Sequence, residues 1–482
     1  MPFAITEWKK MFILAKTFTN YIIPIHMKKI SFLLLLTLFV SCAFAAKSGW
    51  VNLFNGKNLV GWKVVNGNAD YKIVNGEIVG TSICNSPNSF LATTVNYGDF
   101  ILEYEMKMDR GLNSGVQIRS ISDPAVMNGR VHGYQVECDD SERAWSAGIY
   151  DEARRGWLYP MEYNQAAKKS YKKGEWNSYR VECVGNTIRT WLNGVPCVNL
   201  VDEVTASGLI ALQVHAIGQR KEDEGKTICW RNIRIKTEKL ASEQKKTDAP
   251  EVSYLNNSLT KAEQKEGWKL LWDGKCMNGW LNAKDGKQPS KGWTILDNEV
   301  VANLKDNKGG GDIVTEKEYK NFVLEVDFMF TPRANGGIKY FIQPNPNGEG
   351  FSSIGCEYQI LDDKLHPDAK LGINGNRTLA SLYDLIPANS QKFDPAQSVK
   401  RSNGVNQWER ARIEVRGEKV AHYLNGIKIV EYTRGTPEWK ALVATSKFAK
   451  HAGFGEYATG HILLQDHGDE VHYRNIKIKE IK

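Results

Sequence analysis

The amino-acid sequence predicts an all-β protein built from two tandem sandwich-like domains, and two observations support this. First, seven short motifs occur twice in the same order, more than 200 residues apart, a spacing too long for a solenoid repeat. Second, many segments between these motifs alternate polar and apolar side chains, as half-buried strands do. The chain therefore contains two related domains of about 200 residues, each large enough for its own core.

The duplicated motifs can be followed from one copy to the next. The first copy opens with residues 50–57 (WVNLFNGK) and the second with residues 268–275 (WKLLWDGK). The first residues of the other paired motifs are Asn113 and Asn335, Tyr134 and Tyr358, Ile149 and Leu382, Leu192 and Leu424, Leu212 and Leu464, and Arg231 and Arg474. Their common order indicates a gene duplication.

Strand patterns and tight turns recur inside each copy. Residues 100–108 and 322–330 alternate polar and apolar side chains in their second halves, which predicts antiparallel strands with one face on the core. Residues 179–192 and 412–424 each form a hairpin pattern around a two-residue turn. A helical pattern occurs only over 438–450. Many short strands with Gly and Asn turns predict a sandwich or jelly roll, with long loops over a concave face.

The domain boundaries follow from composition. The first domain spans 49–236 and the second 267–482, and the polar stretch 237–266 is expected to be a solvated linker with room for a short helix. Residues 27–45 combine a charged start, an apolar run and a small-residue cleavage site, which predicts a signal peptide. We therefore expect residues 1–26 to be an extension from a wrongly assigned start codon.

The signal peptide predicts where the mature protein lies. Its apolar run is too short for a permanent membrane helix, so we expect a soluble periplasmic protein without a transmembrane anchor. The alternative is an outer-membrane lipoprotein attached through Cys42. Seven cysteines follow the signal with no paired-cysteine metal spacing, and we expect buried free thiols.

Charge and aromatic content narrow the partners. The net charge is +8 with acids and bases interspersed and no basic arm, which argues against nucleic-acid binding. The 14 Trp residues suit both a β core and sugar stacking. The second copy is also about 20 residues longer between its Leu424 and Leu464 motifs than the first copy is between Leu192 and Leu212. Loops that diverge on a shared scaffold are where specificity changes.

Three segments together resemble a known family. They are residues 54–62 (FNGKNLVGW), residues 355–363 (GCEYQILDD), and the Gln-x-His pattern followed by Arg-Asn-Ile in both copies. They resemble the 3-keto-glucoside 1,2-lyase / 3-keto-2-hydroxyglucal hydratase family, long described as 3-keto-disaccharide hydrolases. The resemblance covers both copies. It implies concanavalin-like jelly rolls in the bacterial envelope, a 3-keto-glycoside substrate, and a functional link to a sugar 3-oxidoreductase.

The implied reaction sets chemical requirements. A ketone at C3 acidifies the C2 hydrogen, a base removes it, and the aglycone leaves from C1; water can then add back. The site needs a general base, a proton donor and a positive group at the enolate oxygen.

In the second copy, Glu357 and His467 are the predicted base and acid. Glu357 shares a strand face with Gln359, and His467 shares one with Gln465. A hydrogen-bonded structural role is the alternative for His467. The expected substrate-binding side chains are Gln359, Gln465, Lys339, Arg377, Tyr383 and Asp384. Lys339 is the candidate for the enolate, with a solvated surface lysine as the alternative.

The first copy differs from the second at the position of Glu357. Aligning Tyr134 with Tyr358 puts Gly133 in the place of Glu357, so the acid is expected to have moved to Glu137, with His215 as its partner. The expected binding side chains are Gln135, Arg119, Tyr150, Asp151, Arg154 and Arg155. An active site and a pure binding module both remain open for this copy.

No cofactor is required by these residues, and a divalent metal ion is an open hypothesis because no tight ligand spacing such as His-Glu-x-x-His occurs. Two other functions compete with 3-keto-glycoside cleavage. One is ordinary glycoside hydrolysis by two carboxylates; the other is a lectin-like protein that binds carbohydrate without chemistry.

Overall fold

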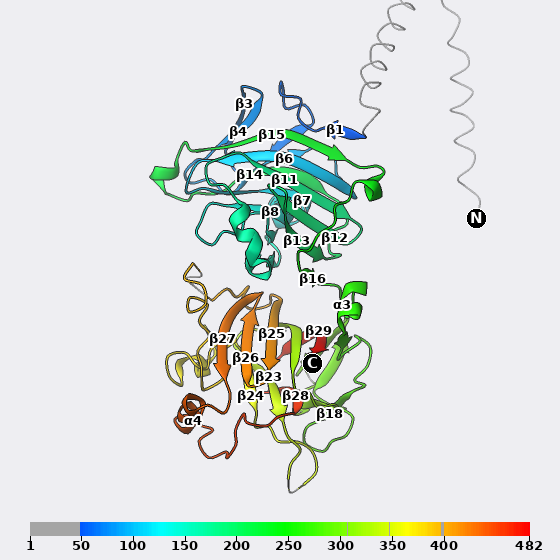
Figure 1. Ribbon diagram of the computed structural model, residues 1–482, viewed down its shortest axis with the longest axis vertical. Coiled ribbons are helices and arrows are strands. Elements are labelled where there is room, and N and C mark those ends of the chain that lie inside the picture. The colour runs from blue at the N-terminus through cyan, green and yellow to red at the C-terminus, as the bar shows by residue number, and fades with distance from the viewer. Residues whose placement is uncertain (1–48, 306, 347, 397–399) are drawn as a thin grey trace, which may run out of the picture.

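A computed structural model describes residues 49–305, 307–346, 348–396 and 400–482. Figure 1 shows two β-rich bodies stacked along the long axis, the first copy from blue to green and the second from green to red. The predictions about the signal peptide, the start codon and Cys42 fall outside the described residues. Within those residues, no helix has both the length and the apolar character needed to cross a bilayer.

Each copy is a sandwich of two largely antiparallel sheets, as the sequence predicts. The nine-stranded sheet of the first copy runs in the order β16 (Glu251–Ser253), β13 (Val195–Val201), β12 (Thr187–Leu192), β11 (Asn177–Val184), β6 (Phe100–Met108), β15 (Thr227–Lys236), β4 (Glu77–Thr81) and β3 (Asp70–Val74), with β1 (Trp50–Asn52) on β15. The seven-stranded sheet runs β10 (Gly156–Tyr159), β9 (Ile149–Glu152), β8 (His132–Asp139), β7 (Asn113–Ile121), β14 (Leu209–Val214), β5 (Ser89–Thr93) and β2 (Trp62–Val65).

The second copy repeats this plan with fewer strands. Its eight-stranded sheet runs β19 (Trp293–Leu296), β20 (Glu299–Ala302), β29 (Val471–Glu480), β22 (Phe322–Phe330), β25 (Glu409–Arg416), β26 (Lys419–Leu424) and β27 (Ile427–Thr433), with β17 (Trp268–Leu270) on β29. The five-stranded sheet runs β18 (Trp280–Asn282), β21 (Ile313–Thr315), β28 (His461–Leu464), β23 (Asn335–Ile342) and β24 (Cys356–Leu361).

Helices are short. In the described part of the chain the α-helices are α3 (Lys261–Glu266) and α4 (Pro437–Ala444), and the 3-10 helices are η1 (Met127–Gly129), η2 (Met161–Tyr163), η3 (Gln165–Ser170), η4 (Lys221–Asp223), η5 (Leu240–Ser242) and η6 (Pro367–Lys370). The helical pattern over 438–450 corresponds to α4, which ends at Ala444, six residues before the pattern does. The Thr436 side chain caps this helix by accepting a hydrogen bond from Trp439 N at 3.2 Å.

The predicted hairpins form with their predicted turns. β11 pairs with β12 across residues 185–186, and β25 pairs with β26 across residues 417–418. β6 alternates in burial as expected, but β22 is buried on both faces. Glu325 and Asp327 lie on the outward face of β22 and are covered, because Lys477 and Arg410 form ion pairs with them.

One apolar core fills the space between the sheets of each copy. Trp230 and Ile78 are fully buried in the first core, and Phe328 and Tyr358 in the second. All seven described cysteines are free thiols, and Cys276 is the one among them that is not buried. Cys183, on β11, and Cys197, on β13, lie in the first core unbridged.

The stretch expected to be a solvated linker is integrated into the fold. β16 pairs in parallel with β13, so the linker extends the first copy's larger sheet. The linker residue Tyr254 donates its hydroxyl to the Leu158 carbonyl oxygen at 2.9 Å. Pro250 accepts a hydrogen bond from the Tyr159 hydroxyl at 2.8 Å. The linker is polar in composition, as predicted. It is not fully solvated, however, because side chains of the first copy cover part of it.

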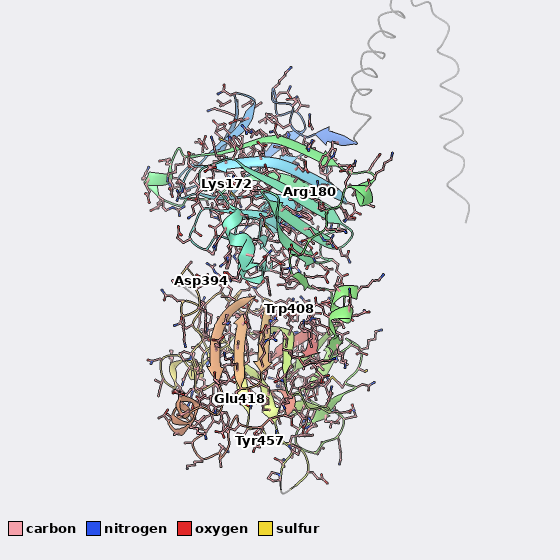
Figure 2. The ribbon with its side chains drawn as sticks, viewed as in Figure 1. Lys172, Arg180, Asp394, Trp408, Glu418 and Tyr457 are labelled. Atoms are coloured by element: carbon pink, nitrogen blue, oxygen red, sulfur yellow. The ribbon has the colours of Figure 1, made fainter. Side chains whose placement is uncertain are left out.

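Arg410, on β25 of the second copy, binds this linker. Its guanidinium pairs with Asp327 at 2.6 and 3.1 Å, donates to the Ser253 carbonyl oxygen at 2.8 Å, and lies 3.8 Å from the Tyr254 ring centroid. A second contact joins the copies where Lys168 Nζ lies 3.3 Å from Asp394 Oδ2. Figure 2 shows Asp394 and Trp408 at the junction of the two bodies. The linker and the second copy are therefore packed together.

We expect Arg410→Leu to destabilise the second copy and loosen its hold on the linker. The change leaves the buried Asp327 carboxylate without its cation, which costs about 3 kcal/mol in buried pairs of this kind. Urea denaturation followed by tryptophan fluorescence measures the change. Arg416→Leu, at an arginine whose side chain is 58% exposed, is the control. A midpoint equal to that of the control would contradict the anchoring role.

Candidate functional site

The register of three strands in the second copy brings the predicted site residues together. β24 pairs with β23 so that Glu357 stands opposite Lys339 and Gln359 opposite Gly337. β28 pairs with the other edge of β23, and its continuation places Gln465 N on the Gly337 carbonyl oxygen at 2.9 Å. Because side chains alternate along a strand, these polar groups point away from the core, into which Tyr358 is packed.

Gly337 gives the Glu357 side chain its place. A Cβ on Gly337 would lie 2.3 Å from Glu357 Oε1 and 3.0 Å from its Cδ. The strand therefore needs glycine here because the carboxyl group folds across its backbone. The first copy has the same device, since a Cβ on Gly115 would lie 2.6 Å from Gln135 Cγ.

Glu357, Lys339 and Gln465 form the centre of the site. Lys339 Nζ lies 3.8 Å from Glu357 Oε2, and both side chains are more than 90% buried. With its amide turned to the orientation that satisfies both neighbours, Gln465 donates to Glu357 Oε1 at 3.3 Å and accepts from Lys339 Nζ at 3.1 Å. Lys339 also donates to the Ser353 carbonyl oxygen at 3.1 Å. Lys339 is thus a buried partner of the carboxylate, and the alternative of a solvated surface lysine is wrong.

Burial sets the proton affinity of Glu357. Removal from water raises the pKa of this carboxyl group, and the charges of Lys339 and Lys447 oppose that rise. Burial likewise lowers the pKa of Lys447, against the pull of Glu357. A carboxylate with a raised pKa is a better proton acceptor than a solvated one.

His467 lies at the edge of this cluster and is exposed to solvent. Its Nε2 is 3.5 Å from Asn335 Nδ2, and Asn335 Oδ1 accepts from Gln359 Nε2 at 2.9 Å. A positive charge on His467 would lower the pKa of Glu357. Glu357 and Gln359 share one face of the five-stranded sheet by alternation, and Asn335 links Gln359 to His467 at the edge of that face.

The other predicted binding residues form a rim held by ion pairs. Arg377 binds Asp384 Oδ1 at 2.6 Å and Asp368 Oδ1 at 3.0 Å. The Tyr383 hydroxyl donates to Asp368 Oδ2 at 2.8 Å. Lys447 Nζ lies 4.0 Å from the Tyr383 ring centroid. Arg377 and Asp384 pair with each other, and Asp368 links Arg377 to the Tyr383 hydroxyl. These contacts hold Tyr383 in position at the site.

Lys447, Asp368 and Asp312 belong to the site and were not predicted from the sequence. Lys447 lies within the extra 20 residues of the second copy, just after α4, and its backbone N–H donates to Asp384 Oδ2 at 2.8 Å. Asp312 accepts from Asp466 N at 2.9 Å, and burial raises its pKa. The insertion was the one signal available in the sequence, and it indicated the segment but not the residue.

The first copy contains an equivalent cluster, but the alignment made from the sequence was two residues out of register. On the sheet, Gln135 stands opposite Gln117 and Glu137 opposite Gly115. Gln135 therefore occupies the place of Glu357, and Glu137 that of Gln359. The Tyr-Gln motif misled because it recurs by chance at the shifted position.

The glutamine and the glutamate occupy exchanged positions in the two copies, and the charges at the first-copy site differ as a result. Gln117 Nε2 donates to Gln135 Oε1 at 2.7 Å, a neutral pair where the second copy has Lys339 and Glu357. Glu137 accepts from Asn113 Nδ2 at 2.5 Å and Gln135 Nε2 at 3.0 Å, and Arg143 lies 3.9 Å away. Burial, opposed by Arg143, raises the pKa of Glu137 to about 7.

His215 and Tyr150 lie beside this cluster. Tyr150 stands opposite Gln135 across β8 and β9. His215 Nδ1 lies 2.8 Å from the Ala216 carbonyl oxygen, and burial lowers its pKa. A neutral, hydrogen-bonded imidazole is therefore the form present near neutral pH.

Four predicted binding residues of the first copy, Arg119, Asp151, Arg154 and Arg155, lie apart from this cluster. Arg119 is 1% exposed and donates to the Gly98 and Gly185 carbonyl oxygens, both at 2.8 Å. A backbone φ of +47° at Arg119, within a register shift of β7, turns it from the sheet face.

Asp151, Arg154 and Arg155 form a structural ion network. Asp151 is fully buried and pairs with Arg154 at 2.7 Å and Arg155 at 2.6 Å. Arg155 also binds Asp202 at 2.7 Å. Asp151 stands opposite the core residue Tyr134, so alternation directs it away from Glu137. Over the described ranges, no group of three or more His, Cys, Asp or Glu side chains is placed to hold a metal ion.

Comparison with known proteins identifies the family. The model of the 3-keto-alpha-glucoside-1,2-lyase-like domain matches residues 49–236 and again residues 267–479. The chain belongs to this family, in two copies, and so to the carbohydrate-active proteins. A protein of Bacteroides thetaiotaomicron named 3-keto-disaccharide hydrolase is 34% identical over 271 residues, covering 50% of this chain and 89% of that protein.

The chain is also similar to two solved structures. A Parabacteroides distasonis protein, provisionally named a glycosyl hydrolase, is 29% identical and covers 47% of this chain and all of its own, with a TM-score of 0.41. The carbohydrate-binding module CBM66 of Bacillus subtilis is 17% identical and covers 36% of this chain and 94% of its own, with a TM-score of 0.26.

We expect Gly337→Ala to displace the Glu357 carboxyl group while the sandwich still folds. The added methyl group would lie 2.3 Å from Glu357 Oε1, so the side chain must rotate. A crystal structure of the variant measures this. Gly336→Ala, on the opposite face with its nearest contact at 3.2 Å, is the control. An unmoved Glu357 in Gly337→Ala would refute the packing account.

Proposed function

We propose that the second copy cleaves 3-keto-glycosides by removing the C2 proton and expelling the aglycone from C1. The observation that carries this proposal is a buried carboxyl group, Glu357, held beside a buried ammonium group, Lys339, at 3.8 Å. A base and a cation on one side of a small site are what enolate formation requires.

Each group has a role in the proposed reaction. Glu357 takes the proton from C2, and the C2–H electrons move into a C2–C3 double bond as the C3 oxygen becomes negative. Lys339 stabilises that oxygen. The C3 ketone then re-forms, a C1–C2 double bond appears, and the C1–O bond breaks. His467, exposed at the edge of the cluster, protonates the departing oxygen.

The same groups can also catalyse the addition of water to the product of the elimination. Glu357, protonated after the first step, returns its proton to C2 while a water molecule adds its hydroxyl at C1 and gives its other proton to His467, which lost one to the aglycone. This hydration converts the 3-keto-2-hydroxyglucal into a free 3-keto sugar. Elimination followed by hydration amounts to hydrolysis, which agrees with the name 3-keto-disaccharide hydrolase carried by the relative. The substrate must come from an oxidoreductase that oxidises C3.

Ordinary glycoside hydrolysis and pure carbohydrate binding are the rival functions. A glycosidase needs two carboxyl groups across the scissile bond, whereas Glu357 is contacted by a cation and an amide. Pure binding requires neither a proton acceptor nor a cation at an enolate oxygen. We also propose export to the periplasm through residues 27–45, with lipidation at Cys42 as the alternative. A divalent ion remains a hypothesis.

Glu357→Gln is expected to lower turnover of a 3-keto-glucoside by roughly 10²- to 10⁴-fold, the contribution of a general base. The amide keeps the shape of the side chain but cannot accept the C2 proton. Formation of the enone, followed by ultraviolet absorbance, measures the reaction. Glu316→Gln, at an exposed glutamate of the same copy, is the control.

The choice of substrate separates the rival functions. The parent glucoside, not oxidised at C3, should give no product. Turnover of that glucoside would support ordinary hydrolysis, and binding of both sugars without turnover would support a lectin.

Removing Lys339 is expected to shift the pH profile. Glu357 must be ionised to act, and burial raises its pKa above the usual value of about 4.3, so kcat/KM should fall as the pH drops through that raised value. The Lys339 cation favours the ionised form, and Lys339→Met therefore moves the acid limb to higher pH and lowers the plateau. A pH profile of kcat/KM measures both effects. An unshifted limb would remove Glu357 as the titrating base.

A further inference from the structure

A loop of the second copy reaches into the site of the first. The Arg401 guanidinium lies 5.1 Å from the ring centroid of Trp145. Two residues later, Asn403 packs on Gly156 in the β9–β10 hairpin, where a Cβ on the glycine would lie 2.7 Å from Asn403 Oδ1. Residues of both copies therefore meet at this edge of the seven-stranded sheet.

Arg401 packs against an aromatic and cationic wall, in which Tyr150 and Trp157 are partly exposed and Trp145 is fully buried. Trp145 and Trp157 pack edge to face with ring centroids 4.5 Å apart, and Tyr150 lies 5.2 Å from Trp157. Arg143 covers both tryptophans, at 4.5 and 5.1 Å. Tyr150 stands directly opposite Gln135, so this wall borders the cluster around Glu137.

Charged and polar groups of the first copy also act on the pKa of Arg401. Burial, and next the Arg143 guanidinium, lower the pKa of Arg401, while Asp139, Tyr150 and Glu137 act in the opposite direction. All four of these neighbours belong to the first copy, and Glu137 is the carboxyl group at its centre.

The loop is held in place by a buried carboxyl group of its own domain. Glu409, which is 1% exposed, accepts from Asn403 N at 2.6 Å and Gly404 N at 3.1 Å. The Ser402 hydroxyl and the Asn425 amide donate to it as well. Arg401 therefore extends from an anchored turn.

The floor of the first-copy site is rich in amides. Gln117 and Gln135 bind each other where the second copy has a lysine and a glutamate. Gln213, the counterpart of Gln465, is fully buried, and both polar atoms of its amide are without a hydrogen-bond partner among the described residues. Amides donate and accept at once, as sugar hydroxyls require of their partners.

We propose that the first copy holds a second carbohydrate site, and that Arg401 of the second copy completes its wall. Its ligand is the neutral ring of a glycoside, with hydroxyls on the amides and one face against the wall formed by Tyr150, Trp157 and Arg401. That the ligand is a glycoside rests on the proposed function. That residues of both copies form the site rests on the contacts between the copies.

The test uses a 3-keto C-glucoside, in which carbon replaces the glycosidic oxygen so that elimination cannot occur. Calorimetric titration of the full chain should show two binding events. Arg401→Ala should weaken one of them at least five-fold and leave the other unchanged, whereas Glu357→Gln should alter only the other. Arg401→Lys should restore little, because an ammonium group lacks the planar face that stacks on a ring.

Arg416→Ala is the matched control, an exposed arginine on β25 away from the junction. A single binding event, or two events that Arg401→Ala leaves untouched, would overturn the proposal, and the contact would then be packing between domains alone. Two events together with no turnover of a 3-keto-glucoside would reject the proposed reaction and leave the second site standing.

Discussion

The site depends on one constraint, the antiparallel register between β23 and β24. Register fixes which side chains stand opposite one another, and a shift by one residue would turn every polar group of these strands into the core. The pairing of Lys339 with Glu357 therefore follows from the backbone ladder. Gly337 completes the arrangement by leaving open the volume that the carboxyl group occupies. The low dielectric around this pair then strengthens its electrostatic interaction.

The two copies show how one scaffold holds two kinds of cluster. The same register relates Gln117 to Gln135 and Lys339 to Glu357, so the difference lies in side chains alone. Moving the carboxyl group two residues along β8, to Glu137, separates it from the position opposite Gln117 and surrounds it with amides. Glu357 has the buried Lys339 ammonium group 3.8 Å away, whereas the cation near Glu137 is the Arg143 guanidinium, at 3.9 Å. The position opposite the central strand residue therefore carries a cation in the second cluster and a neutral amide in the first.

Much of the fold was accessible from the sequence because strands and hairpins are encoded locally. The alternation of polar and apolar side chains predicted β6, and the two-residue turns predicted both hairpins. The grouping of Glu357 with Gln359 also followed from alternation. What depends on long-range pairing was not accessible. A motif match could not fix the register of Gln135, the turn of Arg119 away from the sheet arises from a backbone irregularity, and the approach of Lys447 to Tyr383 requires an insertion to fold back. The ion network of Asp151 was misread because a charged run looks the same in a site and in a core.

Neighbouring residues of β25 perform two tasks that connect the copies. Arg410 holds the linker through Ser253 and Tyr254, and Glu409 holds the turn that carries Arg401. Both side chains are buried, so neither task tolerates much movement of the strand. If the junction between the copies opened, the wall of the first site would lose Arg401, whereas the cluster around Glu357 lies entirely within the second copy and would stay whole. Duplication followed by docking thus makes the first site dependent on the second domain, and the dependence does not run the other way.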